Sequence, residues 1–146
     1  STFPHRTNMP SSGVFVSRLA ASSGRESGNM TTNHVLEWSP FRLKSGVEET
    51  TLLQVSERMQ RDFLANQDGF VRRELIKRAE GAYTDLVWWD SFAASQSAMK
   101  KAACSPAVRA YLEVMDFSAG DPRDAVSLFG VVGAYRPQPR VLALAM

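Results

Sequence analysis

The spacing of hydrophobic residues changes along the chain between a period of two and a helical period, which predicts both strands and helices. Leu52, Val55, Met59 and Phe63 recur at helical spacing, and a second helical segment begins near residue 91. Four segments rich in β-branched and aromatic residues are the predicted strands: residues 35–43, 70–78, 83–89 and 125–135. The predicted order is strand, helix, strand, strand, helix, strand. This order is typical of an α+β, ferredoxin-like fold with a four-stranded antiparallel sheet.

Local signals predict where several elements begin and end. Ser45 and Glu48 have the spacing of a capping box and predict a helix start. Gly81 suits the tight turn of a hairpin between the second and third strands. The pair Ser105-Pro106, a cap residue followed by proline, predicts that the second helical segment is interrupted there. Pro40 lacks an N–H donor, which predicts an edge position or a bulge in the first strand.

Composition predicts one folded domain with two extensions. The chain has 146 residues, 44% of them hydrophobic and 22% charged, as expected for a single globular domain with its own core. Residues 1–33 are rich in Ser, Gly, Thr and Asn and are predicted to be a flexible arm, with Met30 as a candidate natural start. Residues 34–135 form the predicted domain. Residues 136–146 form an apolar tail that we expect to dock on a partner subunit.

Charge and cysteine content exclude several classes of function. Of the 17 basic and 15 acidic residues, three and one lie in residues 1–29, which leaves 14 of each in residues 30–146. A neutral body has no basic surface for nucleic acid. No apolar run approaches the roughly 18 residues of a membrane span. One cysteine and two histidines predict no disulfide and no zinc cluster, and they fit a reducing, cytoplasmic location.

Four stretches of the chain resemble a known family. They are VLEWSPFRLKSGVEE, DFLANQDGFVRREL, YTDLVWWDSFAASQSA and SPAVRAYL. Over residues 35–135 the chain is similar to the antibiotic biosynthesis monooxygenase-like family of the dimeric α+β barrel superfamily. The resemblance implies a homodimer whose two sheets pack face to face, with helices on one face of each sheet and a pocket on the other. The pattern of the predicted strands agrees with a sheet that is covered on both faces, because neither face of the first strand is cleanly polar.

The resemblance also implies which residues of the third strand face the pocket. The Trp at the end of this strand tends to face the pocket in the superfamily, and that residue is Trp89 here. Alternation then places Tyr83 and Asp85 on the same face as Trp89. Leu86 and Trp88 are expected to pack against the helices.

Further pocket residues are expected on the first two strands. Ser39 lies where haem-degrading members of the superfamily carry an Asn, and Glu37 and Phe41 share its face. The second strand contributes Arg72 or Arg73, which the pattern does not distinguish; Arg73 is taken as the candidate.

The chain departs from the haem-degrading members in two places. Ser39 replaces the Asn, and residues 91–115 contain no His to bind an iron. We therefore expect no haem and no other cofactor. The chain still resembles the cofactor-independent monooxygenases of the superfamily. These enzymes hold a phenolic substrate in an aromatic pocket, where the anion of the substrate reacts with oxygen. Trp89 and Tyr83 could stack such a substrate, and an Arg could stabilise the anion.

Each of these assignments has a structural alternative. Trp89 and Tyr83 could simply fill the core, which is the commoner use of large aromatic residues. Asp85 and Glu37 could form an acid/base pair, but a structural ion pair with Arg72 or Arg73 is favoured, because carboxylates on an interior face need a partner. We therefore expect either a monooxygenase-like enzyme acting on an aromatic or polyketide-like compound, or a non-catalytic, ligand-binding or stress-associated dimer. An enclosed pocket of a few hundred Å³ lined by Trp89, Tyr83 and a polar group favours the enzyme, and a barrel filled by those same side chains favours the non-catalytic protein.

Overall fold

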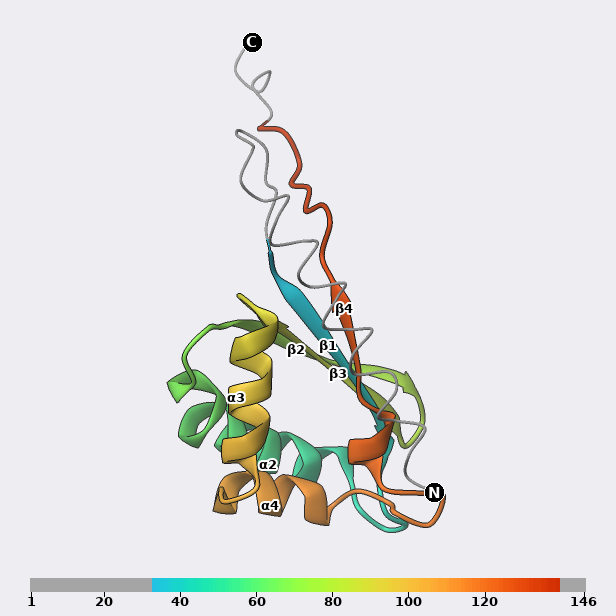
Figure 1. Cartoon of the computed structure of the whole chain (residues 1–146). Helices are drawn as coiled ribbons and strands as arrows, with labels where there is room; N and C mark the ends of the chain where they lie inside the picture. Colours follow the sequence, from blue (N-terminus) through green and yellow to red (C-terminus); the bar gives the residue numbers. More distant parts are fainter. Residues whose placement is uncertain (1–32, 140–146) are drawn as a thin grey trace.

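A computed structural model of the protein describes residues 33–139 (Figure 1). It contains four strands, three α-helices and two short 3₁₀ turns, labelled η. In chain order these are β1 (Val35–Arg42), α2 (Glu49–Asp62), η1 (Leu64–Asn66), β2 (Phe70–Ala79), β3 (Ala82–Trp89), α3 (Phe92–Ala102), α4 (Pro106–Glu113), η2 (Pro122–Ala125) and β4 (Ser127–Gly130).

The four strands form one antiparallel sheet, and the helices cover one of its faces (Figure 1). The strand order is β2-β3-β1-β4, and all neighbouring pairs are antiparallel. This is the ferredoxin-like arrangement that the element order predicts. The interruption between α3 and α4 is also confirmed, since α3 ends at Ala102 and α4 begins at Pro106.

Alternation along β3 separates a face that the helices cover from a face that they leave open, although Ala82 and Thr84 at the start of the strand are buried on the second face as well. Tyr83, Val87 and Trp89 are buried on the side of the helices. Leu86 and Trp88 pair with neighbours on the opposite, open face. The expectation that Leu86 and Trp88 pack against the helices was therefore wrong. A strand exposes alternate residues to opposite sides, so one misassigned side moves all of them.

The core lies between the sheet and the helices. Its fully buried side chains include Trp89 from β3, Leu52 from α2 and Val35 from β1. Leu52 and Met59 lie on the apolar stripe of α2, as the helical spacing predicts. Burying a large apolar side chain contributes roughly 1.5–3 kcal/mol, so these residues hold the helix layer on the sheet.

Of the two predicted helix starts, the one at Ser105 is confirmed and the one at Ser45 is not, and Ser91 caps a further helix. The side chains of Ser91 and Ser105 accept hydrogen bonds from Ala94 N and Val108 N and cap α3 and α4. The capping box at Ser45 was wrong, because α2 begins only at Glu49. Gly46 has φ +87°, so the chain makes a turn where the helix was expected to start.

The fourth strand is shorter than the predicted segment 125–135. β4 pairs with β1 only at Val35–Trp38, and its last residue, Gly130, lies opposite the first residue of β1. One further backbone hydrogen bond, from Val131 N to His34 O at 2.8 Å, lies just beyond this pair, where β1 begins. The same geometry explains Pro40, which lies in an inner strand but beyond the stretch that β4 covers.

The predicted arm and tail lie largely outside the described part of the chain. This holds for residues 1–32 and 140–146, so the structure tests neither the arm nor the docking of the tail. Residues 131–139 form no helix or strand and run away from the helices (Figure 1). Among residues 33–139, no helix combines the length and apolarity that a bilayer crossing requires.

Gly69 is a close contact between the start of β2 and the start of α3, and its replacement tests this packing. The residue has φ +84°, and a Cβ built there would lie 2.4 Å from the Cβ of Ala94. We expect Gly69→Ala to lower the free energy of unfolding by more than the roughly 1–3 kcal/mol of backbone strain alone. Gly46→Ala is the control, because Gly46 has a similar φ of +87° and nothing within 4 Å of its Cβ position. Equal losses in urea unfolding for the two variants would contradict the close packing at Gly69.

Candidate functional site

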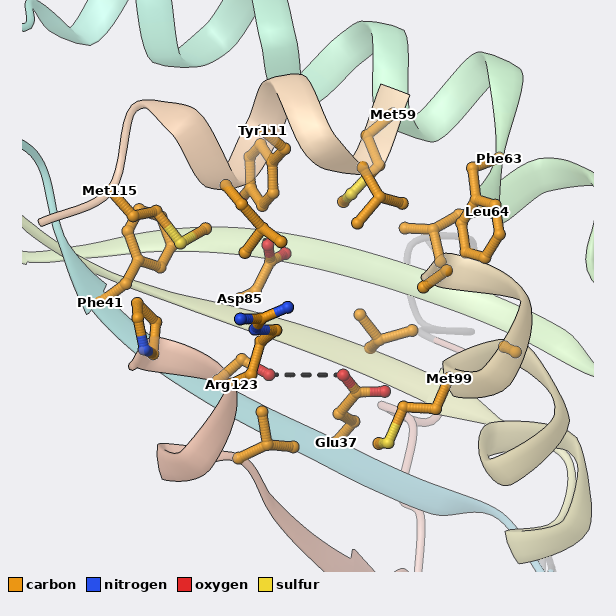
Figure 2. Close-up of a pocket in the computed structure, with 18 of the residues that line it drawn as sticks. Glu37, Phe41, Met59, Phe63, Leu64, Asp85, Met99, Tyr111, Met115 and Arg123 are labelled. Atoms are coloured by element: carbon orange, nitrogen blue, oxygen red, sulfur yellow. Dashed lines mark hydrogen bonds between the residues drawn. The ribbon is translucent and has the colours of Figure 1, made fainter. Parts of the chain in front are cut away.

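A cavity of about 390 Å³ lies between the sheet and the helices (Figure 2). It is partly open to solvent and has the size of an ordinary small-molecule site. The expectation of a pocket on the other face of the sheet was therefore wrong, because the helices stand away from the strands and leave space between them. Apolar side chains make up most of the lining: Phe41, Met59, Phe63, Leu64, Val87, Ala98, Met99, Ala102, Val108, Leu112 and Met115.

The most distinctive polar group of the lining is the carboxylate of Glu37. Glu37 and Trp89 are diagonal neighbours on β1 and β3, because Glu37 pairs with Val87 and Val35 pairs with Trp89. Trp89 Nε1–H therefore reaches the carboxylate and donates to Oε1 at 2.9 Å. Ser39 Oγ donates to Oε2 at 3.4 Å, the bond drawn in Figure 2. These neutral donors orient the carboxylate without neutralising it.

Burial raises the pKa of Glu37 above its usual range, although the hydrogen bond from Trp89 opposes this shift. The negative charge of nearby Asp85 adds to the increase. No ion pair to Glu37 is present within the described residues. A carboxylate with a raised pKa at the wall of an apolar cavity can take a proton from a weakly acidic ligand, which is the behaviour of a general base.

The second carboxylate of the lining, Asp85, has a different environment. Arg73 Nε donates to Asp85 Oδ1 at 2.7 Å, and both side chains are only 7% exposed. The same guanidinium donates to Ser56 Oγ at 2.8 Å and to the Ser56 carbonyl at 3.2 Å. Tyr111 completes the group by donating its hydroxyl hydrogen to Asp85 Oδ2. This buried ion-pair cluster connects β2 and β3 to α2 and α4.

The hydroxyl of Tyr111 remains protonated in this cluster. Burial and the adjacent Asp85 charge both raise its pKa well above the usual range of a tyrosine. A phenol that stays protonated acts as a hydrogen-bond donor. Tyr111 therefore stabilises the Asp85 carboxylate, and its ring forms part of the cavity wall.

The structure brings together five of the seven predicted site residues. Glu37, Ser39, Phe41, Asp85 and Trp89 all line the cavity.

The other two predicted residues, Tyr83 and Arg73, are not part of the lining. The Tyr83 ring stacks on Phe41 with centroids 5.8 Å apart, and its hydroxyl donates to Glu49 Oε1 at 2.7 Å. Arg73 lies behind Asp85 in the ion-pair cluster. The structure also shows which of the two arginines lies on the covered face. It is Arg73, because Arg72 lies on the opposite face with its Cζ 3.9 Å from the ring centroid of Trp88.

Several lining residues were not identified from the sequence. Met59 and Phe63 belong to the stripe that we assigned to the core, and they contribute both to the core and to the cavity wall. Tyr111 shares a helical face with Val108 and Met115, a signal that could have placed it near the site. Arg123 lies on η2, a turn for which the sequence carries no periodic signal.

Solved structures similar to this one include oxygenases. The chain superposes on SnoaB from Streptomyces nogalater, described as a cofactor-independent oxygenase, with a TM-score of 0.52 and 20% identity over 73% of this chain and 98% of that chain. A point mutant of SnoaB gives a TM-score of 0.51 with 18% identity over the same shares. A haem-degrading enzyme of Mycobacterium tuberculosis, MhuD, has 21% identity over 70% of this chain and 99% of that chain, but its TM-score of 0.43 supports no argument.

These comparisons establish the fold. No protein-family description matches the chain, and no curated protein sequence matches it. The chain shares its fold with SnoaB, so the fold that the sequence resemblance implies is confirmed.

Removing Asp85 should show how strongly the ion-pair cluster holds the helices to the sheet. Asp85→Ala leaves the Arg73 guanidinium buried without a counter-charge, which costs roughly 3–5 kcal/mol of the free energy of unfolding. Asp62→Ala is the control, because it also removes the partner of an arginine, but at a site about half exposed where a pair contributes at most about 1 kcal/mol. Urea unfolding compares the two. A loss for Asp85→Ala no larger than that for Asp62→Ala would show that the cluster does not hold the layers together.

Proposed function

We propose that the protein is a monooxygenase-like enzyme that works without a prosthetic group and acts on an aromatic or polyketide-like phenol. One observation carries the proposal. Within residues 33–139 the Glu37 carboxylate forms no ion pair, and it lies at the wall of an apolar cavity with its pKa raised and its orientation set by Trp89. The fold shared with a cofactor-independent oxygenase supports the same class of reaction.

In the proposed reaction, Glu37 acts as the general base. A flat phenolic substrate fills the apolar cavity, and the carboxylate takes the proton of its hydroxyl group. The resulting phenolate is electron-rich and reacts with molecular oxygen. One oxygen atom enters the substrate, and the other leaves as water with two hydrogens taken from the substrate, so no external reductant is needed.

The apolar lining contributes to the same chemistry. A cavity surrounded mainly by Met, Phe, Leu and Val side chains has few groups that can donate a proton. Water is a poor competitor in such a space, so a reactive anion is protected from side reactions. The side chain of Trp89 forms part of the cavity wall, and its N–H orients the carboxylate of the proposed base.

A second candidate is a binding protein that holds the same kind of ligand without converting it. One observation favours it: Tyr83, expected to be a second aromatic wall of the site, is instead packed against Phe41 and bonded to Glu49. The two candidates share the cavity and differ in turnover. Oxygen consumption in the presence of bound phenol distinguishes them.

We also propose that the protein forms a homodimer through the open face of the sheet. Trp38, Ile76 and Phe129 lie on this face and are 38%, 36% and 49% exposed. Large apolar side chains gathered on one face of a sheet are stabilised when a second copy covers them. Residues 131–139 run away from the body and expose Val132 and Tyr135, two more apolar side chains that a second copy could cover.

Replacing Glu37 tests the proposed base. Glu37→Gln keeps the size of the side chain but cannot accept a proton, so we expect turnover to fall by roughly 10²–10⁴-fold. Stability at neutral pH should not fall, because the raised pKa means that folding disfavours the charged form. For the wild type, stability should decrease as pH rises through the raised pKa of Glu37, and turnover should increase over the same range. Turnover is measured as oxygen uptake with a panel of flat phenols, and stability is measured by thermal unfolding.

Two further variants control this experiment. Glu57→Gln changes an exposed carboxylate on α2 and should leave turnover unchanged. Trp89→Phe removes the hydrogen bond that lowers the pKa of Glu37, so turnover should fall and the pH midpoint of the remaining activity should move upward. Full activity in Glu37→Gln would exclude this residue as the base.

A charge placed on the open face should dissociate the proposed dimer. A buried tryptophan at an interface typically contributes about 2 kcal/mol or more, so we expect Trp38→Glu to raise the dimer dissociation constant by at least roughly 30-fold. Leu53→Glu is the control, because Leu53 is 47% exposed on α2, away from the sheet. Sedimentation velocity at micromolar concentration measures both variants. A wild-type protein that sediments as a monomer would contradict the proposal.

A further inference from the structure

The mouth of the cavity carries a single guanidinium, that of Arg123 on η2. Among the residues lining the cavity in the described part of the chain, Arg123 is the only basic one. Its side chain is 63% exposed although it lines the cavity, so it lies at the rim. Met99 on α3 is also partly exposed and lines the cavity (Figure 2). The rim of the cavity therefore includes the guanidinium of Arg123 on η2 and the side chain of Met99 on α3.

The guanidinium is held in place by Asp121, the cap residue of η2. The Asp121 carboxylate accepts from Arg123 Nε at 3.0 Å and from Nη2 at 2.6 Å. It also accepts from the backbone N–H of Arg123 at 2.9 Å, so both ends of the pair are anchored to one short turn. These hydrogen bonds fix the orientation of the Arg123 side chain at the surface.

The bonds to Asp121 leave one edge of the guanidinium unused. A guanidinium has two edges on which parallel N–H groups can bind a carboxylate, and Asp121 occupies the edge formed by Nε and Nη2. Nη1 has no hydrogen-bond partner within residues 33–139, so the edge formed by Nη1 and Nη2 remains available. This edge fits a planar carboxylate.

Glu37 and Arg123 are therefore two charged groups that line one cavity without forming an ion pair with each other. Glu37 is suited to a group that gives up a proton, and Arg123 is suited to a group that is already negative. Between them the lining is apolar. A ligand that satisfies all three regions is a flat aromatic molecule with a hydroxyl group at one position and a carboxylate at another.

From this arrangement we infer that the natural ligand is a phenol bearing a carboxylate, and that Arg123 selects it by binding the carboxylate at the mouth of the cavity. The inference rests on the proposed function, since the phenol is assigned to Glu37. It adds the anionic group and the residue that recognises it.

Two matched compounds test this selection by isothermal titration calorimetry at neutral pH. They are 6-hydroxy-2-naphthoic acid and 2-naphthol, which differ only in the carboxylate. We expect the wild-type protein to bind the acid roughly three- to tenfold more tightly, a modest factor because the site is partly exposed and Asp121 is already present. Arg123→Gln should remove this preference and leave the affinity for 2-naphthol within about twofold of the wild type. Salt should weaken binding of the acid and not of 2-naphthol.

The control variant is Arg109→Gln, which removes the same charge from an exposed position on α4 outside the cavity lining and should keep the preference. If both compounds bind equally, or if Arg123→Gln keeps the preference, the role of Arg123 is overturned while the cavity remains an aromatic site. If neither compound binds, the proposed function fails together with this inference. If Arg109→Gln loses the preference as well, the effect is one of overall charge, and Arg123 is not the selecting residue.

Discussion

The buried ion pair between Arg73 and Asp85 is the interaction on which the rest of the structure depends. Two carboxylates project from the sheet into the layer under the helices, and neither is stable there without compensation. Arg73 neutralises Asp85 at 2.7 Å and reaches Ser56 on α2, while Tyr111 on α4 donates to the same carboxylate. The helices are thereby attached to the sheet through polar contacts on one side of the cavity, and the space beside these contacts remains open.

Because Arg73 is paired with Asp85, the hydrogen-bond donors to the Glu37 carboxylate in the described part of the chain are the neutral side chains of Trp89 and Ser39. Because their partners differ, Asp85 has a structural role and Glu37 is the candidate base. The uncompensated charge of Glu37 opposes folding at neutral pH, since burial raises its pKa. A cost of this kind is common at functional sites, where a group is held ready for a reaction instead of being fully stabilised.

The two faces of the sheet differ in the side chains that they carry. The covered face carries the cavity, the proposed base Glu37 and, through η2, the guanidinium of Arg123. The open face carries apolar side chains such as Trp38 and Phe129, which suit a second copy of the chain. Strand alternation links the two faces, because the residue next to each site residue necessarily points to the other face. A change in the register of β1 or β3 would therefore disturb both.

The sequence by itself determined the element order, the break at Ser105, the hairpin at Gly81 and the set of residues on one face of β3, because these depend on local propensity and on a period of two. Only the tertiary structure decided which face the helices cover, that Arg73 and not Arg72 meets Asp85, and that Tyr83 bonds Glu49. Alternation divides a strand into two faces but does not say which of them the helices cover. That choice is made by packing against helices that are distant in the sequence. The place of Arg123 at the cavity could not be predicted from the sequence for the same reason. Arg123 lies in a turn, which has no periodic pattern, and the surrounding fold brings the turn to the cavity.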